Sequence, residues 1–169
     1  MKTATLTLNG KTYEVQLTDE QITEIEKPKK VTGFGRAEEG EDYFNIDATG
    51  TICTGTIYSR NKYFEGLYNN ANYYTDESLA EWCNRNDALN RKIRRWAAEH
   101  NTEPIDWNKR NAKYYIYYNY EESRVGVYNT HYCAHPGEIF FFDYVIAKAA
   151  VEKFGDEIKW LAENRPKWF

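Results

Sequence analysis

Residues 113–143 constrain the fold most, because three β-rich runs there lead directly into a helical pattern. The runs are KYYIYYNY from Lys113, RVGVYNTHYC from Arg124 and GEIFFFD from Gly137, and the helical pattern begins at Tyr144. Strands in this order can bury one face of a sheet under an amphipathic helix. We therefore expect a three-stranded antiparallel sheet with one helix over residues 113–164, with Asp143 as the N-cap. The first run is typical of a central strand, because it has Tyr or Ile at nearly every position.

A weaker copy of this order lies upstream, over residues 43–101. Its strand-like runs are DYFNID, TICTGTIYS and NNANYYTD, and the third strand is expected at residues 72–75. A helical pattern follows from Glu77 to His100, with apolar residues at three- and four-residue spacing. Residues 59–70 are polar and predict a loop, and residues 102–112 predict a connector between the two modules. The shared order suggests an internal duplication.

The N-terminal residues 1–27 predict a β-hairpin followed by a short helix. Asn9-Gly10 lies between two alternating runs, which is the strongest short-range hairpin signal, and Thr18 is a good N-cap. Residues 28–42 contain Pro28 and three glycines and predict a linker. The expected fold class is therefore α+β, with two sheet-plus-helix modules and an N-terminal hairpin-helix.

The charge of the chain is unevenly distributed. The net charge is −4, but residues 85–113 hold eight bases and four acids, a net charge of +4 that leaves −8 for the rest. An acidic chain is not a basic nucleic-acid binder as a whole. No run approaches a membrane span and three cysteines show no metal spacing, so we expect a reduced, cytoplasmic protein that makes no membrane contact.

The sequence carries no signature of a catalytic or metal site. It has no G-x-S-x-G, P-loop, G-x-G-x-x-G or H-E-x-x-H motif, and its adjacent acids lie in expected turns or caps. His131, Cys133 and His135 could share one face of a strand, but no second clustered pair of ligands completes a zinc site. We therefore expect no enzymatic activity, no metal and no cofactor.

Three groups of residues are candidates for a binding surface. The first is a ridge of bases on the long helix, the second lies in the connector, and the third consists of aromatic residues in the expected loop. They comprise Arg91, Arg94 and Arg95, then Trp107, Lys109 and Arg110, then Tyr63, Phe64 and Tyr68. Tyr, Trp and Arg are the residue types that dominate binding energy at protein interfaces. The alternatives are a solvated helix face for the bases and a return into the core for the loop aromatics.

Several of these segments together resemble a loose family of small proteins encoded by phages, prophages and mobile elements of gut Gram-positive bacteria. The segments are DYFNIDATGTI, NYYTDESLAE, KYYIYYNY, GEIFFFD and FGDEIKWLAE, and the N-terminal LNGKTYEVQLTDEQ is also common in such proteins. Some proteins of this kind inhibit bacterial defence, including anti-CRISPR proteins that block Cas9-type nucleases. The resemblance implies a non-enzymatic inhibitor that binds a host defence protein.

The alternative function is a nucleic-acid-binding accessory protein that uses the basic 85–113 segment. Its phosphate contacts would make the affinity fall steeply with salt. The sequence leaves the oligomeric state open.

Overall fold

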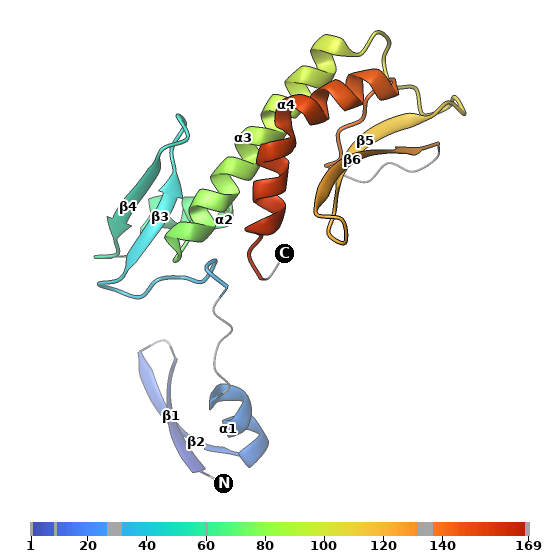
Figure 1. The fold of residues 1–169 in the computed structure, drawn as a ribbon. Coiled ribbons are helices and arrows are strands. Elements are labelled where there is room, and N and C mark those ends of the chain that lie inside the picture. The colour runs from blue at the N-terminus through green and yellow to red at the C-terminus, as the bar shows by residue number, and fades with distance from the viewer. Residues whose placement is uncertain (1, 9, 27–31, 60, 132–136, 168–169) are drawn as a thin grey trace. The chain divides into compact units, whose positions relative to one another are not determined.

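The computed structural model describes residues 2–8, 10–26, 32–59, 61–131 and 137–167. The chain divides into two compact units, Met1–Thr32 and Gly33–Phe169 (Figure 1). Both units mix helices with small antiparallel two-stranded sheets, which confirms the expected α and β composition. Among the described residues, no helix is both long enough and apolar enough to cross a membrane.

The smaller unit is the expected hairpin and helix. Strands β1 (Lys2–Leu8) and β2 (Lys11–Leu17) pair antiparallel, and Gly10 has the positive φ of 75° that the tight turn requires. Helix α1 (Asp19–Glu26) begins with a capping box between Thr18 and Gln21. The Gln21 N–H donates to Thr18 Oγ1 at 3.2 Å, and the Thr18 N–H donates to Gln21 Oε1 at 2.9 Å.

The first half of the larger unit is a hairpin covered on both faces. Strands β3 (Asp42–Ile46) and β4 (Ile52–Thr56) pair antiparallel, and helix α3 (Glu77–His100) begins at the N-cap Asp76. Phe44 and Ile46 pack with Leu79 of α3 on one face of the hairpin. The other face carries Tyr43, which packs against helix α2 (Lys62–Asn69).

The second half is a hairpin covered on one face. Strands β5 (Lys113–Asn119) and β6 (Arg124–Thr130) pair antiparallel, and helix α4 (Tyr144–Glu163) begins at the expected N-cap Asp143. Apolar residues of α3, α4 and the hairpin form the largest core cluster, which includes Leu89, Ile93, Phe141, Ala147, Ala150 and Leu161. Helix α3 is long because its first half covers β3–β4 and its second half packs against α4 (Figure 1).

The expected third strands are not formed, so each sheet of the larger unit has two strands. Residues 72–75 and 139–142 each contribute one antiparallel bridge, from Tyr74 to Phe44 and from Phe141 to Tyr114. The physical reason in the first half is that the Asn72 side chain, rather than its backbone, bonds to β3. In the second half, Phe141 is the only one of residues 139–142 that makes backbone bonds to β5.

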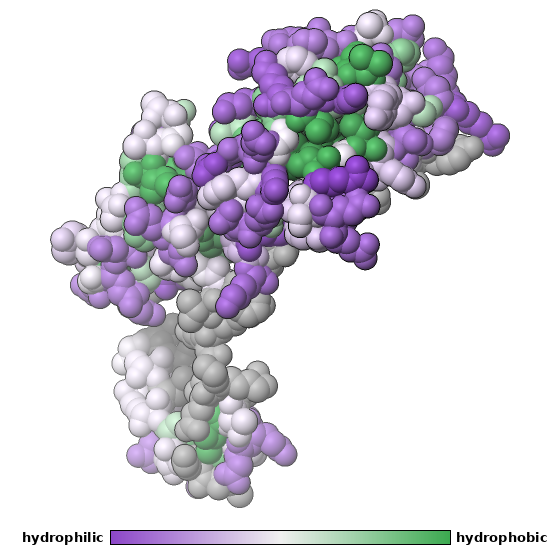
Figure 2. Space-filling view, in the orientation of Figure 1, coloured by the Kyte–Doolittle hydropathy of each residue, from purple (hydrophilic) through white to green (hydrophobic). Residues whose placement is uncertain are grey.

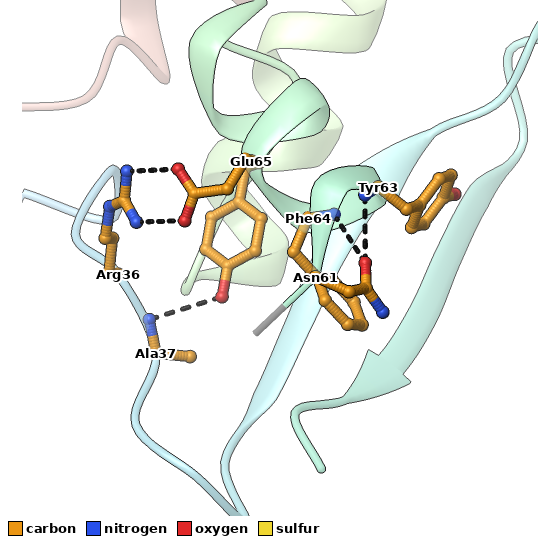
Figure 3. A network of polar contacts seen from close by, with 7 residues as sticks. Arg36, Ala37, Asn61, Tyr63, Phe64 and Glu65 are labelled. Carbon is orange, nitrogen blue, oxygen red and sulfur yellow. Dashed lines mark hydrogen bonds and ion pairs between the residues drawn. The ribbon is translucent and has the colours of Figure 1, made fainter. Parts of the chain in front are cut away.

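The prediction of a loop at residues 59–70 is also wrong, because this segment contains helix α2. The Asn61 side chain accepts hydrogen bonds from the Tyr63 and Phe64 N–H groups at 2.9 and 3.2 Å and so caps the helix (Figure 3). An eight-residue helix is marginal alone, and its packing on Tyr43 and Tyr73 stabilises it.

Candidate functional site

The basic residues of α3 form an exposed ridge. Arg91, Arg94 and Arg95 are exposed, as is Lys92, and they follow one another along the second half of the helix. Arg91 also borders a polar hollow of about 510 Å³ beside the β3–β4 turn, which is lined by residues such as Asp47, Asn84 and Asp87. This ridge could contact phosphates or an acidic protein surface.

Two of the eight bases in residues 85–113 hold the fold together instead. Arg85 donates through Nε and Nη2 to Glu157 of α4, both at 2.9 Å, and its guanidinium lies 3.4 Å from the centroid of the Trp160 ring. This pairing lowers the pKa of Glu157 below its ordinary value. Lys113 is only 1% exposed, and its Nζ donates to the carbonyl oxygen of Lys109.

The aromatic residues of α2 divide between the core and the surface. The Phe64 ring meets the Tyr43 ring edge-on at a centroid distance of 5.2 Å, whereas Tyr63 is exposed. Tyr68 is at the rim, with the Arg36 guanidinium 4.1 Å from its ring centroid. Arg36 also forms a bidentate ion pair with Glu65 at 2.6 and 2.9 Å, which ties α2 to the segment before β3 (Figure 3).

The second hairpin carries a row of aromatic side chains on the face that points away from the helices. We call this set the aromatic row, and it consists of Trp107, Tyr115, Tyr117, Tyr128 and Phe140. Adjacent rings meet edge-on, with centroids between 4.9 Å and 6.2 Å apart. Tyr128 is 59% exposed and Trp107 is 39% exposed. The described helices of the larger unit pack on the opposite face of the hairpin, and Tyr115 and Tyr117 are half-buried among the neighbouring rings.

An apolar groove lies between β5 and the two long helices. It has a volume of about 500 Å³ and is lined by polar side chains such as Asn86, Asn90 and Glu138 as well as by apolar ones. The apolar wall, from which we name the groove, includes Leu89, Ile93, Ile116, Ile139, Ile158 and Leu161. Figure 2 shows apolar side chains gathered at this place, between α4 and the hairpin. A hollow of this size is within the range of volumes that ligand sites have.

The nine predicted binding residues lie in three separate places. Trp107 belongs to the aromatic row, and Lys109 and Arg110 are exposed in the same connector. The α3 ridge and α2 form the other two groups, and Phe64 is drawn into the core beside Tyr43. Sequence reasoning did not select Tyr115, Tyr117, Tyr128 or Phe140. The alternation of residues along paired strands, which places 115, 117 and 128 on one face, could have found three of them.

The possible metal cluster falls mostly outside the described residues. His131 is exposed, whereas Cys133 and His135 are among the residues that the structure does not describe. Within the described ranges, no three His, Cys, Asp or Glu side chains are grouped so that they could hold a metal. Cys53 and Cys83 are free thiols, and burial raises the pKa of Cys83.

Comparison of the chain with models of protein families, with curated proteins and with solved structures found no match. Function is therefore inferred from the surfaces above and from the resemblance of the sequence.

Proposed function

We propose that this chain is a non-enzymatic, phage-encoded inhibitor that binds a bacterial defence protein in the host cytoplasm. The specific target proposed is a Cas9-type effector. The aromatic row supports the protein-binding part of the proposal, and the sequence resemblance supports the phage origin and the target.

A comparison of the two hairpins carries the argument. In the first hairpin, α2 covers the face that points away from α3, and Tyr43 is only 7% exposed there. On the corresponding face of the second hairpin, Tyr115 and Tyr117 of β5 are half-buried, and Tyr128 of β6 is 59% exposed. The exposed side chains of Tyr128 and Trp107 support a protein interaction site here, because tyrosine and tryptophan concentrate binding energy. The bases Lys109 and Arg110 flank Trp107 and would steer an acidic partner.

The test is inhibition of DNA cleavage by a panel of Cas9-type effectors, together with pull-down of each effector. Tyr128→Ala is expected to weaken inhibition at least tenfold, which corresponds to about 1.4 kcal/mol. The matched control is Tyr58→Ala, since Tyr58 is 79% exposed and lies outside the row. Both variants should keep the thermal stability of the wild type. Absence of binding and protection across the panel, extended to other defence systems, would refute the proposal.

The α3 ridge supports a second candidate, a nucleic-acid-binding accessory protein. Exposed Arg91, Arg94 and Arg95 could neutralise phosphates, and the affinity would then fall steeply as salt rises. Replacing these three residues by Ala should abolish a gel shift with DNA or RNA. If the wild type shows no complex even at low salt, this candidate fails, whatever the result of the cleavage assay.

We also propose that the two halves of the larger unit descend from one duplicated module of a hairpin, one further bridge and a helix. In each half, the first strand of the hairpin forms one antiparallel bridge to a residue just before the helix, which is Tyr74 or Phe141. The Asp that caps the helix lies two residues after this bridging residue in both halves. Superposition of residues 43–100 on residues 113–164 tests this proposal. A different spatial order of the elements, or a large displacement of the two helices, would contradict it.

A further inference from the structure

The edge of β3 that faces away from β4 is closed in the first half of the larger unit. Phe44 exchanges two backbone hydrogen bonds with Tyr74, at 2.8 and 2.9 Å. At Ile46, two residues further along β3, the Asn72 side chain makes the two hydrogen bonds that the backbone of a paired strand would make. Its Oδ1 accepts from the Ile46 N–H at 2.8 Å, and its Nδ2 donates to the Ile46 carbonyl oxygen at 2.7 Å.

In the second half, the described residues leave the corresponding edge of β5 open beyond Tyr114. Tyr114 exchanges two backbone bonds with Phe141, at 3.0 and 2.7 Å, so its N–H and C=O groups point away from β6. Alternate residues of a strand point the same way, so the backbone groups of Ile116 and Tyr118 also point away from β6. In the part of the chain that the structure describes, nothing bonds to these groups. The residue that corresponds to Asn72 is Ile139, whose side chain has no hydrogen-bonding atom.

This open edge forms one wall of the apolar groove. Ile116, Tyr118 and Ile139 line the groove on the side of the hairpin. Leu89 and Ile93 of α3 and Ile158 of α4 line it on the side of the helices. The backbone donors and acceptors of Ile116 and Tyr118 therefore lie beside a hollow of about 500 Å³ that has an apolar wall.

We propose that the open edge of β5 and the apolar groove bind an extended peptide strand of a partner protein. The added strand would continue the ladder that Tyr114 and Phe141 begin, and would pair with the N–H and C=O groups of Ile116 and Tyr118. Its alternate side chains are apolar, because every second residue of the strand points into the groove.

Only an extended chain satisfies both observations. A helix bonds its own backbone, so it would leave the groups of Ile116 without partners. An apolar small molecule would fill the groove but would also leave the edge unpaired. The proposed surface is separate from the α3 ridge, and the inference stands whatever the target of the proposed inhibitor is.

The first experiment uses a set of acetylated, amidated hexapeptides that alternate Val or Ile with Thr, added to the full chain. Amide hydrogen exchange is followed at Ile116 and Tyr118, with the Ile46 amide as an internal reference that the Asn72 side chain already protects. Binding peptides are expected to slow exchange at Ile116 and Tyr118 at least tenfold and to leave Ile46 unchanged. The matched control peptide has the same side chains with alternate backbone amides N-methylated, and it should bind at least tenfold more weakly.

A pair of variants tests the same edge from the side of the protein. Tyr118→Pro removes the N–H that faces the groove, whereas Tyr118→Ala keeps that N–H, and both variants lose the side-chain bond to Glu163. Only Tyr118→Pro is expected to weaken peptide binding tenfold or more. Equal binding of the N-methylated peptide, unchanged exchange at Ile116 and Tyr118, or no binding by any peptide of the set would overturn the proposal. The comparison with the N-methylated peptide can overturn the proposal even if the proline variant does not fold.

Discussion

Two tyrosine rings lie directly on glycines of the neighbouring strand. Tyr43 of β3 is opposite Gly55 of β4, and Tyr117 of β5 is opposite Gly126 of β6. A Cβ atom added at Gly55 would lie 2.7 Å from the Tyr43 ring, and one added at Gly126 would lie 2.8 Å from the Tyr117 ring. Real Cβ atoms do not approach other atoms so closely, so a side chain at either position forces its tyrosine to move.

The cost of that movement should differ between the two hairpins. The Tyr43 ring stacks on the Tyr73 ring, with the two centroids 5.1 Å apart, and meets the Phe64 ring edge-on. It therefore cannot move without opening the core. Tyr117 is half-buried in the aromatic row, beside the exposed Tyr128, and can swing toward solvent. Gly55→Ala is therefore expected to lower the free energy of unfolding by about 1–3 kcal/mol, and Gly126→Ala by less than ~1 kcal/mol. Urea denaturation of both variants measures the difference. Equal losses would mean that the second face is as tightly packed as the first.

Single residues with a local role could be predicted from the sequence, and residues with long-range partners could not. The caps Thr18 and Asp143 act on backbone groups within three residues, so the local pattern identifies them. Arg85 was grouped with the basic segment, but its partner Glu157 lies 72 residues further along the chain. Lys113 is buried because the connector folds over it, which the sequence does not encode locally.

At the scale of elements, Arg85 and Glu157 join α3 to α4 through a bidentate ion pair. The ordinary pKa of the Glu157 carboxyl is 4.5, and the hydrogen bonds from Arg85 lower it in the folded protein. A carboxylate with a lowered folded-state pKa stabilises the protein above the unfolded-state pKa, and this stabilisation is lost as the pH falls through the folded-state pKa. Each side chain is about one third exposed, so the stabilisation is reduced by solvent screening.

Glu157→Gln should therefore destabilise the protein at pH 7 and not at low pH. We expect a loss of about 0.5–1 kcal/mol at pH 7, since partly exposed pairs contribute in that range. The difference from wild type should shrink below pH 4.5 and vanish once Glu157 is protonated in the folded wild type. Thermal unfolding at a series of pH values measures it, with Glu152→Gln on the exposed face of α4 as the control. A difference that stays constant with pH would show that packing, rather than charge, carries the effect.

The helices could be predicted from the sequence more completely than the sheets. The long helices have strong three- and four-residue periodicity and clear caps, and their bounds agree with the expectation. The third strands were overestimated because β-rich composition indicates extended backbone but not its pairing partner. Asn72 bonds to β3 through its side chain. Among the described residues, Ile139 makes no bond to β5, either through its side chain or through its backbone. Which of these contacts forms depends on the tertiary arrangement. Helix α2 was missed because eight residues are too few for a clear helical period, and its docking on Tyr43 stabilises it.

At the scale of the whole molecule, the core clusters that the described residues form belong to the larger unit. Their buried residues lie between Ala37 and Leu161, within the unit Gly33–Phe169. Where the burial of side chains is described in the smaller unit, which leaves out Leu6, Leu8 and Ile25, they range from half-buried to exposed. A two-stranded hairpin with one short helix has too little apolar surface to be stable alone in water.

The larger unit should therefore fold without the smaller one. A chain of residues 33–169 is expected to unfold cooperatively with a melting temperature within about 4 °C of the full chain, because a loss of 1 kcal/mol shifts a domain of this size by roughly that amount. A peptide of residues 1–32 is expected to show little stable structure by circular dichroism. Calorimetry of the fragment and of the full chain measures both statements. If deletion of the first 32 residues lowers the melting temperature by more than 10 °C, the hairpin-helix stabilises the larger unit, and the division into two independent folding units is wrong.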